Sequence, residues 1–298
     1  MKTDRRICIS VSDAAQLASV YRSGIVVDEI MMDLSLVLSY LEKDVSGNEL
    51  GQLMKNGIEY DIMLPWIMRE EDHNPIVHDM EMVLEKGYRL GFTGVLVRNL
   101  EELAFLNLHG YQGKIITDYG IYLWNHEALA FLEKDDFGKR RFDVYSFPFE
   151  LNSHEIRNLR QTSTSDLPAA ICLYGRIPMM ISAGCIRKTQ GKCTGKMGQN
   201  YNPGTELTDR IRHALSVTCS CRYCYNVIWN SMPLSLHKQF KDIIKMQMAE
   251  VFRIDLQMEN TQEADAVLAF WKAILQNEQT GNPPYDDYTT GHFKRGVE

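Results

Sequence analysis

The chain has 298 residues, of which 45% are hydrophobic and 24% are charged. These values are ordinary for a globular protein, and the length suffices for one large barrel or two modest domains. No apolar run approaches the ~18 residues needed to cross a membrane, and the start lacks the features of a signal peptide. We therefore expect a cytoplasmic protein with no membrane association. The net charge of −7 argues against a general nucleic-acid binder.

Short β-branched runs alternate with segments of helical periodicity along the chain. Asn99 and Asn152 each precede a Glu at the third position, which predicts capping boxes, and Asn125 predicts a further helix start. Strands and helices that alternate with short connections indicate a parallel sheet. In chain order, the candidate strands are Ile7–Val11, Val26–Met32, Tyr60–Leu64, Gly94–Arg98, Lys114–Asp118, Phe142–Phe147, Ala169–Tyr174, Met179–Ala183 and Phe252–Leu256.

This number of strands favours an α/β fold of the TIM type, a (β/α)8 barrel that is complete or else incomplete and distorted. An open doubly wound sheet is the alternative. We expect the barrel over residues 1–280 and a C-terminal tail over residues 281–298. A stretch rich in Gly, Lys, Asn and Thr at residues 188–208 predicts a long loop, inside a Cys-rich loop insertion at about residues 184–232.

Five of the seven cysteines lie in this insertion. Cys221 and Cys224 form a Cys-x-x-Cys pair, and Cys185 and Cys193 flank the start of the long loop. Four thiolates in two such pairs can hold Zn²⁺ or an iron–sulfur cluster, and the spacing does not choose between the two. Cys219 competes with Cys221 for the ligand role. The remaining two, Cys8 and Cys172, lie in apolar strands and are predicted core residues.

The cysteine segment is also the basic segment of the chain. From residue 176 to residue 222 there are eight basic residues against Glu206 and Asp209, a net charge of +6, so the rest of the chain carries −13. This stretch is either an ordinary solvated loop or a contact for an anionic partner.

If the fold is a barrel, its active face lies at the C-terminal ends of the strands. We therefore expect catalytic carboxylates and substrate-binding side chains there, although each could instead serve as a helix cap or an ion-pair partner. No recognised nucleophile motif or zinc-protease motif is present. The catalytic candidates are Glu150 and Asp118, and the substrate-binding candidates are Arg69, Arg98, Tyr174 and Arg176.

Two segments carry a family resemblance, YGRIPMMISAGC at residues 174–185 and CRYCYNVIWNSMPLS at residues 221–235. They resemble the central signature of peptidase family U-32, the collagenase-like peptidases. LVRNLEEL at residues 96–103 and the ending TGHFKRGVE at residues 290–298 are similar too. The chain looks like only the last, barrel-like region of a long member. The resemblance therefore implies a fragment or a separate half that works with an N-terminal half or a partner barrel of the same family.

The family includes iron–sulfur proteins that hydroxylate RNA bases without oxygen, and their cysteines match Cys185, Cys193, Cys221 and Cys224. The resemblance thus implies a 4Fe-4S cluster, with Zn²⁺ as the alternative, and hydroxylation of an RNA base. A collagenase-like peptidase acting on peptides through Glu150 and Asp118, and a non-catalytic half stapled by zinc, are the other two hypotheses.

Overall fold

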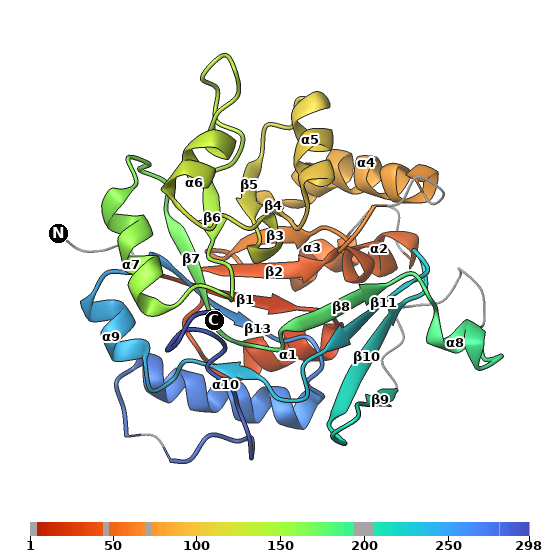
Figure 1. The fold of residues 1–298 in the computed structure, drawn as a ribbon. Helices are drawn as coiled ribbons and strands as arrows, with labels where there is room; N and C mark the ends of the chain where they lie inside the picture. Colours follow the sequence, from red (N-terminus) through yellow and green to blue (C-terminus); the bar gives the residue numbers. More distant parts are fainter. Residues whose placement is uncertain (1–4, 44–47, 69–72, 194–204, 280, 298) are drawn as a thin grey trace.

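The computed structural model describes residues 5–43, 48–68, 73–193, 205–279 and 281–297. Eight parallel strands form a barrel at its centre, and the last strand pairs with both the first and the seventh (Figure 1). The barrel is therefore closed. Its strands, in spatial order, are β1 (Arg6–Val11), β2 (Glu29–Asp33), β3 (Glu59–Met63), β4 (Gly94–Val97), β5 (Lys114–Thr117), β6 (Val144–Ser146), β7 (Ala169–Gly175) and β13 (Val251–Asp255).

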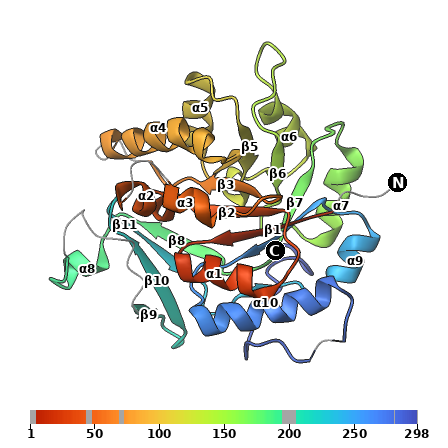
Figure 2. The ribbon, with the colours of Figure 1, turned by 180° about the vertical axis from the view of Figure 1, so that it is seen from behind.

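Helices surround the barrel, as the alternating pattern predicts (Figures 1 and 2). No helix in the described ranges is long and apolar enough to span a membrane. The helices outside the insertion are α1 (Ala14–Ser23), α2 (Leu34–Lys43), α3 (Asn48–Leu53), α4 (His73–Leu90), α5 (Leu100–Leu108), the 3-10 turn η2 (Tyr119–Ile121), α6 (His126–Glu133), α7 (Ser153–Thr162) and α10 (Thr261–Leu275).

The predicted TIM-like barrel is confirmed, and it is complete, so the open sheet is excluded. All eight barrel strands lie within three residues of their predicted bounds. The exception in the list of candidates is Met179–Ala183, which belongs to a separate sheet. A short apolar run cannot by itself tell a barrel strand from a strand elsewhere.

The Cys-rich insertion between β7 and β13 is not the loop that we expected. It contains a four-stranded antiparallel sheet in the order β8–β11–β10–β9. Much of the predicted loop lies outside the described residues, but its two ends form a short helix and a strand. The elements are β8 (Pro178–Ser182), α8 (Ile186–Thr189), β9 (Glu206–Thr208), β10 (Ala214–Ser220) and β11 (Tyr225–Trp229), followed by β12 (Leu234–Ser235) and α9 (Phe240–Lys245).

The C-terminal tail returns to the barrel. Strand β12 pairs antiparallel with β7, and Thr289 bridges to Leu234 of β12. Phe293 is buried, and its carbonyl accepts a hydrogen bond of 2.8 Å from the amide of Ser153 at the start of α7. The predicted tail thus packs against the β6–β7 side of the barrel mouth.

The middle of the barrel is filled by one apolar side chain from each strand. The eight are buried and form a single cluster, as expected for a barrel whose interior is a packed core. Cys8 belongs to this cluster, which confirms it as a core residue, and Cys172 is also buried. The cluster consists of Cys8, Met31, Met63, Leu96, Ile116, Val144, Ala170 and Val251.

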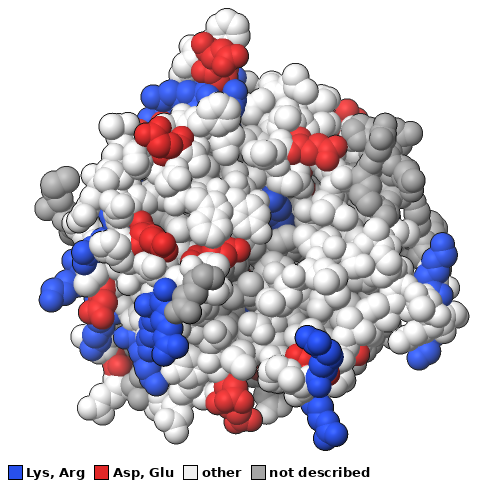
Figure 3. Space-filling model, in the orientation of Figure 1, with Lys and Arg blue, Asp and Glu red and all other residues white. Residues whose placement is uncertain are grey.

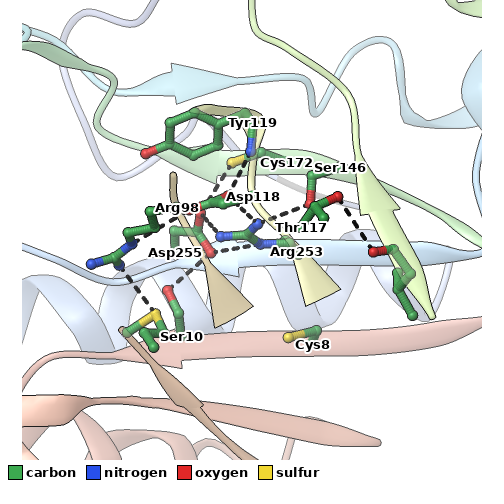
Figure 4. Close-up of polar contacts among 12 residues, drawn as sticks. Cys8, Ser10, Arg98, Thr117, Asp118, Tyr119, Ser146, Cys172, Arg253 and Asp255 are labelled. Carbon is green, nitrogen blue, oxygen red and sulfur yellow. Dashed lines mark hydrogen bonds and ion pairs between the residues drawn. The ribbon is translucent and has the colours of Figure 1, made fainter. Parts of the chain in front are cut away.

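A charged network lies above this layer, toward the C-terminal ends of the strands (Figure 4). Arg253 of β13 donates to Asp118 at 2.6 Å and to Asp255 at 3.0 Å, and its guanidinium also reaches Ser146 of β6 at 3.2 Å. Burial of all these groups removes water as a competing partner, so the ion pairs must satisfy the charges. The network therefore joins β13 to β5 and β6 through the barrel interior.

Asparagine side chains cap the predicted helices, with one shift from the expected pattern. Asn152 forms the capping box of α7, and Asn125 caps α6. Asn99 accepts from the amide of Glu102 at 2.9 Å, and the Glu102 carboxylate accepts from the amide of Arg98 at 2.7 Å, one residue before the expected partner. Glu102 is fully buried, and this burial raises its pKa to about 8.

Replacement of Arg253 by Met is expected to lower the free energy of unfolding by about 3–5 kcal/mol, because Asp255 would stay buried without a cation and Asp118 would keep only its longer contact with Arg98. Urea denaturation monitored by circular dichroism measures the change. Arg22→Met, which breaks the exposed pair with Asp265, is the matched control and should have little effect. An Arg253→Met protein as stable as the control would contradict the structural role of the network.

The raised pKa of Glu102 predicts a pH dependence of stability. The folded state holds this proton up to about pH 8, whereas the unfolded carboxyl loses it near pH 4.3. Stability therefore falls as pH rises from about 5 to about 8, because the folded state binds more protons in that window. Glu102→Gln should flatten this decline in urea titrations at pH 5, 6, 7 and 8, while Glu101→Gln on the exposed face of α5 should not. Equal slopes in both variants would refute the assignment.

Candidate functional site

A pocket of about 120 Å³ lies between the C-terminal ends of the barrel strands and the insertion sheet. Figure 3 shows a hollow near the middle of this face, with a basic side chain at its edge. Barrel enzymes carry their active sites at this end of the strands. The pocket is lined by Ser12, Asp13, Asp33, Leu34, Pro65, Trp66, Arg98, Thr218, Cys219, Ser220, Tyr223, Tyr225, Val227, Trp229 and Gln257.

Aromatic rings make up much of the pocket wall. Trp66 follows β3 and meets Trp229 of β11 edge-on, with ring centroids 5.8 Å apart. Tyr223 and Tyr225 lie nearly parallel, at an interplanar angle of 11°. The Tyr225 hydroxyl accepts a hydrogen bond of 3.1 Å from the amide of Trp66, so the insertion is attached to the barrel at this wall. A flat ring system is the kind of ligand that such a wall can stack against.

Arg98 brings a positive charge to the pocket from the end of β4. Its guanidinium lies 4.0 Å from the Trp66 ring centroid, as in a cation–π contact. It also donates to the carbonyl of Leu64 at 3.0 Å and lies 3.5 Å from an Asp118 oxygen. Arg98 is 7% exposed, so its orientation is set by these contacts before any ligand enters.

The structure separates the other predicted site residues. Asp118 is buried between Arg253 and Arg98, and it caps η2 by accepting from the amide of Tyr119 at 2.9 Å. Glu150 is half-buried beyond β6 and does not line the pocket. Arg69 lies outside the described residues.

Tyr174 links β7 to the segment after β13, and Arg176 links the end of β7 to the end of the insertion sheet. The Tyr174 hydroxyl donates to Glu259 at 2.8 Å, and burial raises its pKa above the ordinary tyrosine value. Arg176 donates to the carbonyls of Asn230 and Ser231, at 3.0 and 2.8 Å. These contacts lie beside the mouth, and neither side chain lines the pocket.

The insertion sheet gathers cysteines at one end. Cys219 and Cys221 lie at the end of β10, and Cys224 directly precedes β11. Ser182 of β8 pairs with Asn226 of β11, which brings the next segment of chain, with Cys185, to the same end. The side chain of Asn226 holds that segment by donating to the carbonyl of Gly184 at 2.8 Å.

Cys219 has Cys221, Cys185 and Arg187 as electrostatic neighbours. The pKa of the Cys219 thiol is raised to about 11, mainly by burial and then by the neighbouring Cys221 and Cys185, whereas Arg187 lowers it. Arg187 also approaches the Cys221 sulfur, at 3.6 Å. Cys219 thus joins the cysteine cluster and lines the pocket, whereas Cys193 is exposed at the end of the described segment after α8.

The spacing of the sulfurs bears on which metal they could hold. A single tetrahedral Zn²⁺ with bonds of ~2.3 Å needs sulfurs about 3.8 Å apart. Among the described residues, no three cysteines place their sulfurs within 4.8 Å of one another. An iron–sulfur cluster binds each thiolate to a different iron atom, so its ligands lie farther apart.

Seven of the eight basic residues between 176 and 222 are described, and they divide into two groups. Arg176, Arg187 and Arg222 are engaged by carbonyls, a sulfur and carboxylates of the protein itself. Lys196 lies outside the described residues. Four of the eight remain exposed, which leaves them accessible to an anionic partner: Lys188, Lys192, Arg210 and Arg212.

Three carboxylates at the opposite, N-terminal end of the barrel also come within 4.8 Å of one another: Glu29, Glu59 and Asp61. The Lys114 ammonium already lies among them, 2.7 Å from Asp61, 2.8 Å from Glu59 and 3.2 Å from Glu29. Arg6 pairs with Glu29 and Glu59 as well. These cations occupy the position that a metal would take. The three carboxylates and their two cations therefore form an ion-pair cluster that covers the N-terminal end of the barrel.

The aromatic wall and Asp79 were not among the predicted site residues. Asp79 of α4 binds Arg222 and Tyr223, the two residues between Cys221 and Cys224. Trp66 could have been suspected from its place two residues after a predicted strand. No local pattern distinguishes Asp79 from other helix-surface acids, because its partner lies 143 residues away.

Comparisons with known proteins leave the family open. No family model and no curated protein matches the chain. Three solved structures share an approximate likeness. A candidate fructose-1,6-biphosphate aldolase from Coccidioides immitis is 11% identical over 57% of this chain, with a TM-score of 0.40, and the chain spans 64% of its length.

The spore cortex-lytic enzyme SleL of Bacillus cereus is 8% identical over 95% of this chain and 77% of its own, with a TM-score of 0.42. A chitinase from Chromobacterium violaceum is 10% identical over 90% and 98%, with a TM-score of 0.39. Likenesses of this size carry no functional conclusion, and the barrel assignment rests on the strand pairing of the chain itself.

Proposed function

We propose that the chain is the barrel portion of a cytoplasmic iron–sulfur enzyme that hydroxylates an RNA base without oxygen. The observation that carries the proposal is the position of Cys219. It lines the aromatic pocket and also belongs to the cysteine cluster, so a ligand in the pocket would lie next to the metal site. The resemblance to family U-32 supports the same reaction.

The pocket suits a single nucleobase. Its open volume of about 120 Å³ admits one flat ring system, and its rings offer a stacking surface. Bases of single-stranded RNA are recognised by stacking on aromatic side chains and arginine, together with hydrogen bonds to their edges. Arg98, Ser12, Asp33 and Gln257 provide donors and acceptors at the wall for those edges. A base in a duplex would have to be flipped out to enter.

We expect Cys185, Cys221 and Cys224 to hold the cluster, with Cys193, the ligand that the sequence predicts, and Cys219, which lines the pocket, competing for the fourth position. A bound cluster would supply one-electron transfer beside the pocket. Hydroxylation replaces C–H by C–OH and removes two electrons from the base. Without O₂ the reaction requires water and a two-electron acceptor, or else an organic oxygen-atom donor. A partner barrel could bind that acceptor or donor.

Metal analysis tests this proposal first. Protein produced and purified without oxygen should contain iron and sulfide in near-equal amounts and absorb visible light. Single Ser substitutions of Cys185, Cys221 and Cys224 should each lower the iron content severalfold, since each removes one cluster ligand. Substituting Cys219 and Cys193 in turn identifies the fourth ligand. Cys8→Ala, in the barrel core, is the control and should keep full iron.

Stoichiometric zinc without sulfide would replace this proposal by the zinc-stapled, non-catalytic half. Absence of any bound metal would reject both. Cleavage of gelatin or peptides by the metal-free protein would instead support the peptidase hypothesis.

Base binding provides a second test. Trp66→Ala should weaken binding of a short single-stranded RNA by about 1–3 kcal/mol, the usual contribution of one aromatic–base stack. Fluorescence anisotropy at several salt concentrations measures the affinity. Trp124→Ala is the matched control, because Trp124 is 41% exposed and lies outside the pocket lining. Equal affinity of the wild-type and Trp66→Ala proteins would contradict a base-binding pocket.

A further inference from the structure

One carboxylate of a barrel helix binds both middle residues of the Cys221–Cys224 turn. Arg222 donates through Nε and Nη2 to the two oxygens of Asp79, and the Tyr223 hydroxyl donates to the same carboxylate at 3.0 Å. A third guanidinium nitrogen of Arg222 reaches Glu42 of α2. We call Asp79, Arg222 and Tyr223 the Asp79 latch. Figures 1 and 2 both show the end of the β10–β11 hairpin beside α2.

The latch has the geometry of a rigid attachment. Asp79 is 2% exposed, so its charge is removed from water and depends on these partners. A two-point contact between guanidinium and carboxylate fixes orientation as well as distance. Glu42 is more than half exposed and contributes less to that constraint.

The turn that the latch holds is both a wall of the pocket and part of the cysteine cluster. Tyr223 is buried and lines the pocket. Cys224 adopts φ of 54°, a left-handed conformation that residues other than glycine keep only when surrounding contacts impose it. The Tyr225 hydroxyl, bound to the amide of Trp66, attaches the other end of the turn to the barrel.

We propose that Asp79 is a positioning residue of the cysteine site. Through Arg222 and Tyr223 it sets where Cys221 and Cys224 lie relative to the barrel, and it holds the Tyr223 wall of the pocket. The role in metal binding rests on the proposed function, whereas the role in ordering the turn does not. Outer partners that orient metal ligands commonly change metal affinity 10- to 100-fold when they are removed.

The test compares Asp79→Asn with Glu81→Gln in the full chain. Glu81 lies on the same helix and is about half exposed, with only a long contact to His109. The first readout is the alkylation rate of each cysteine in metal-free protein, measured by mass spectrometry. Asp79→Asn should speed alkylation of Cys221 and Cys224 at least severalfold and leave exposed Cys193 unchanged.

The second readout is titration with Co²⁺, whose visible absorption reports thiolate ligation. Asp79→Asn should weaken Co²⁺ binding about 10- to 100-fold and alter the spectrum. Tyr223→Phe, which keeps the ring and removes one contact to Asp79, should change both readouts in the same direction but less. Glu81→Gln should match the wild type in both.

Unchanged alkylation of Cys221 and Cys224 in Asp79→Asn would overturn the positioning role. If wild-type protein binds no Co²⁺ and the anaerobically purified protein holds no iron while the alkylation effect is present, the metal proposal fails and the latch stands. If Asp79→Asn does not fold, Arg222→Lys decides, because lysine keeps the charge and loses the two-point geometry. Faster alkylation of Cys221 and Cys224 in Arg222→Lys supports the latch, and alkylation at the wild-type rates refutes it.

Discussion

The charge balance inside the barrel is the constraint on which the rest of the structure depends. Strand β13 follows the whole insertion in the chain, and it brings Arg253 into a buried position in the barrel. Asp118 and Asp255 compensate that charge, and Arg98 completes a set of two cations and two anions. Because a buried guanidinium without partners would be very costly, β13 can lie in the barrel only with β5 correctly placed.

The same network connects the barrel interior to the pocket. Asp118 forms an ion pair with Arg98 on the barrel-interior side, and Trp66 stacks against Arg98 on the pocket side. Tyr119, which follows Asp118, packs against Trp66 with ring centroids 5.9 Å apart. Asp118 therefore serves to orient the pocket arginine, and this differs from the role of an acid–base catalyst that the strand-end position suggested. The pocket is preorganised by buried electrostatics.

The insertion sheet is attached to this framework at a few defined contacts. Arg176 binds carbonyls at the end of β11, Tyr225 binds the amide of Trp66, and Arg222 binds Asp79. Each contact links a segment of the insertion to a different part of the barrel. The cysteine cluster and the pocket wall are built from the same strands, β10 and β11, so their geometries cannot vary independently.

The sequence by itself determined the barrel, because alternating strand and helix periods arise from local side-chain patterns. It also indicated the helix caps at Asn125 and Asn152 and the core positions of Cys8 and Cys172. Tertiary structure decided that residues 178–229 contain a sheet. Its strands are short and some are partly exposed on both faces, so their sequences lack the alternation of apolar and polar residues that marks a strand. It also decided that Cys219 joins the cysteine cluster, that Asp118 is occupied by two arginines, and that Asp79 binds the Cys-x-x-Cys turn. These outcomes depend on residues far apart in the chain, whose approach no local pattern encodes.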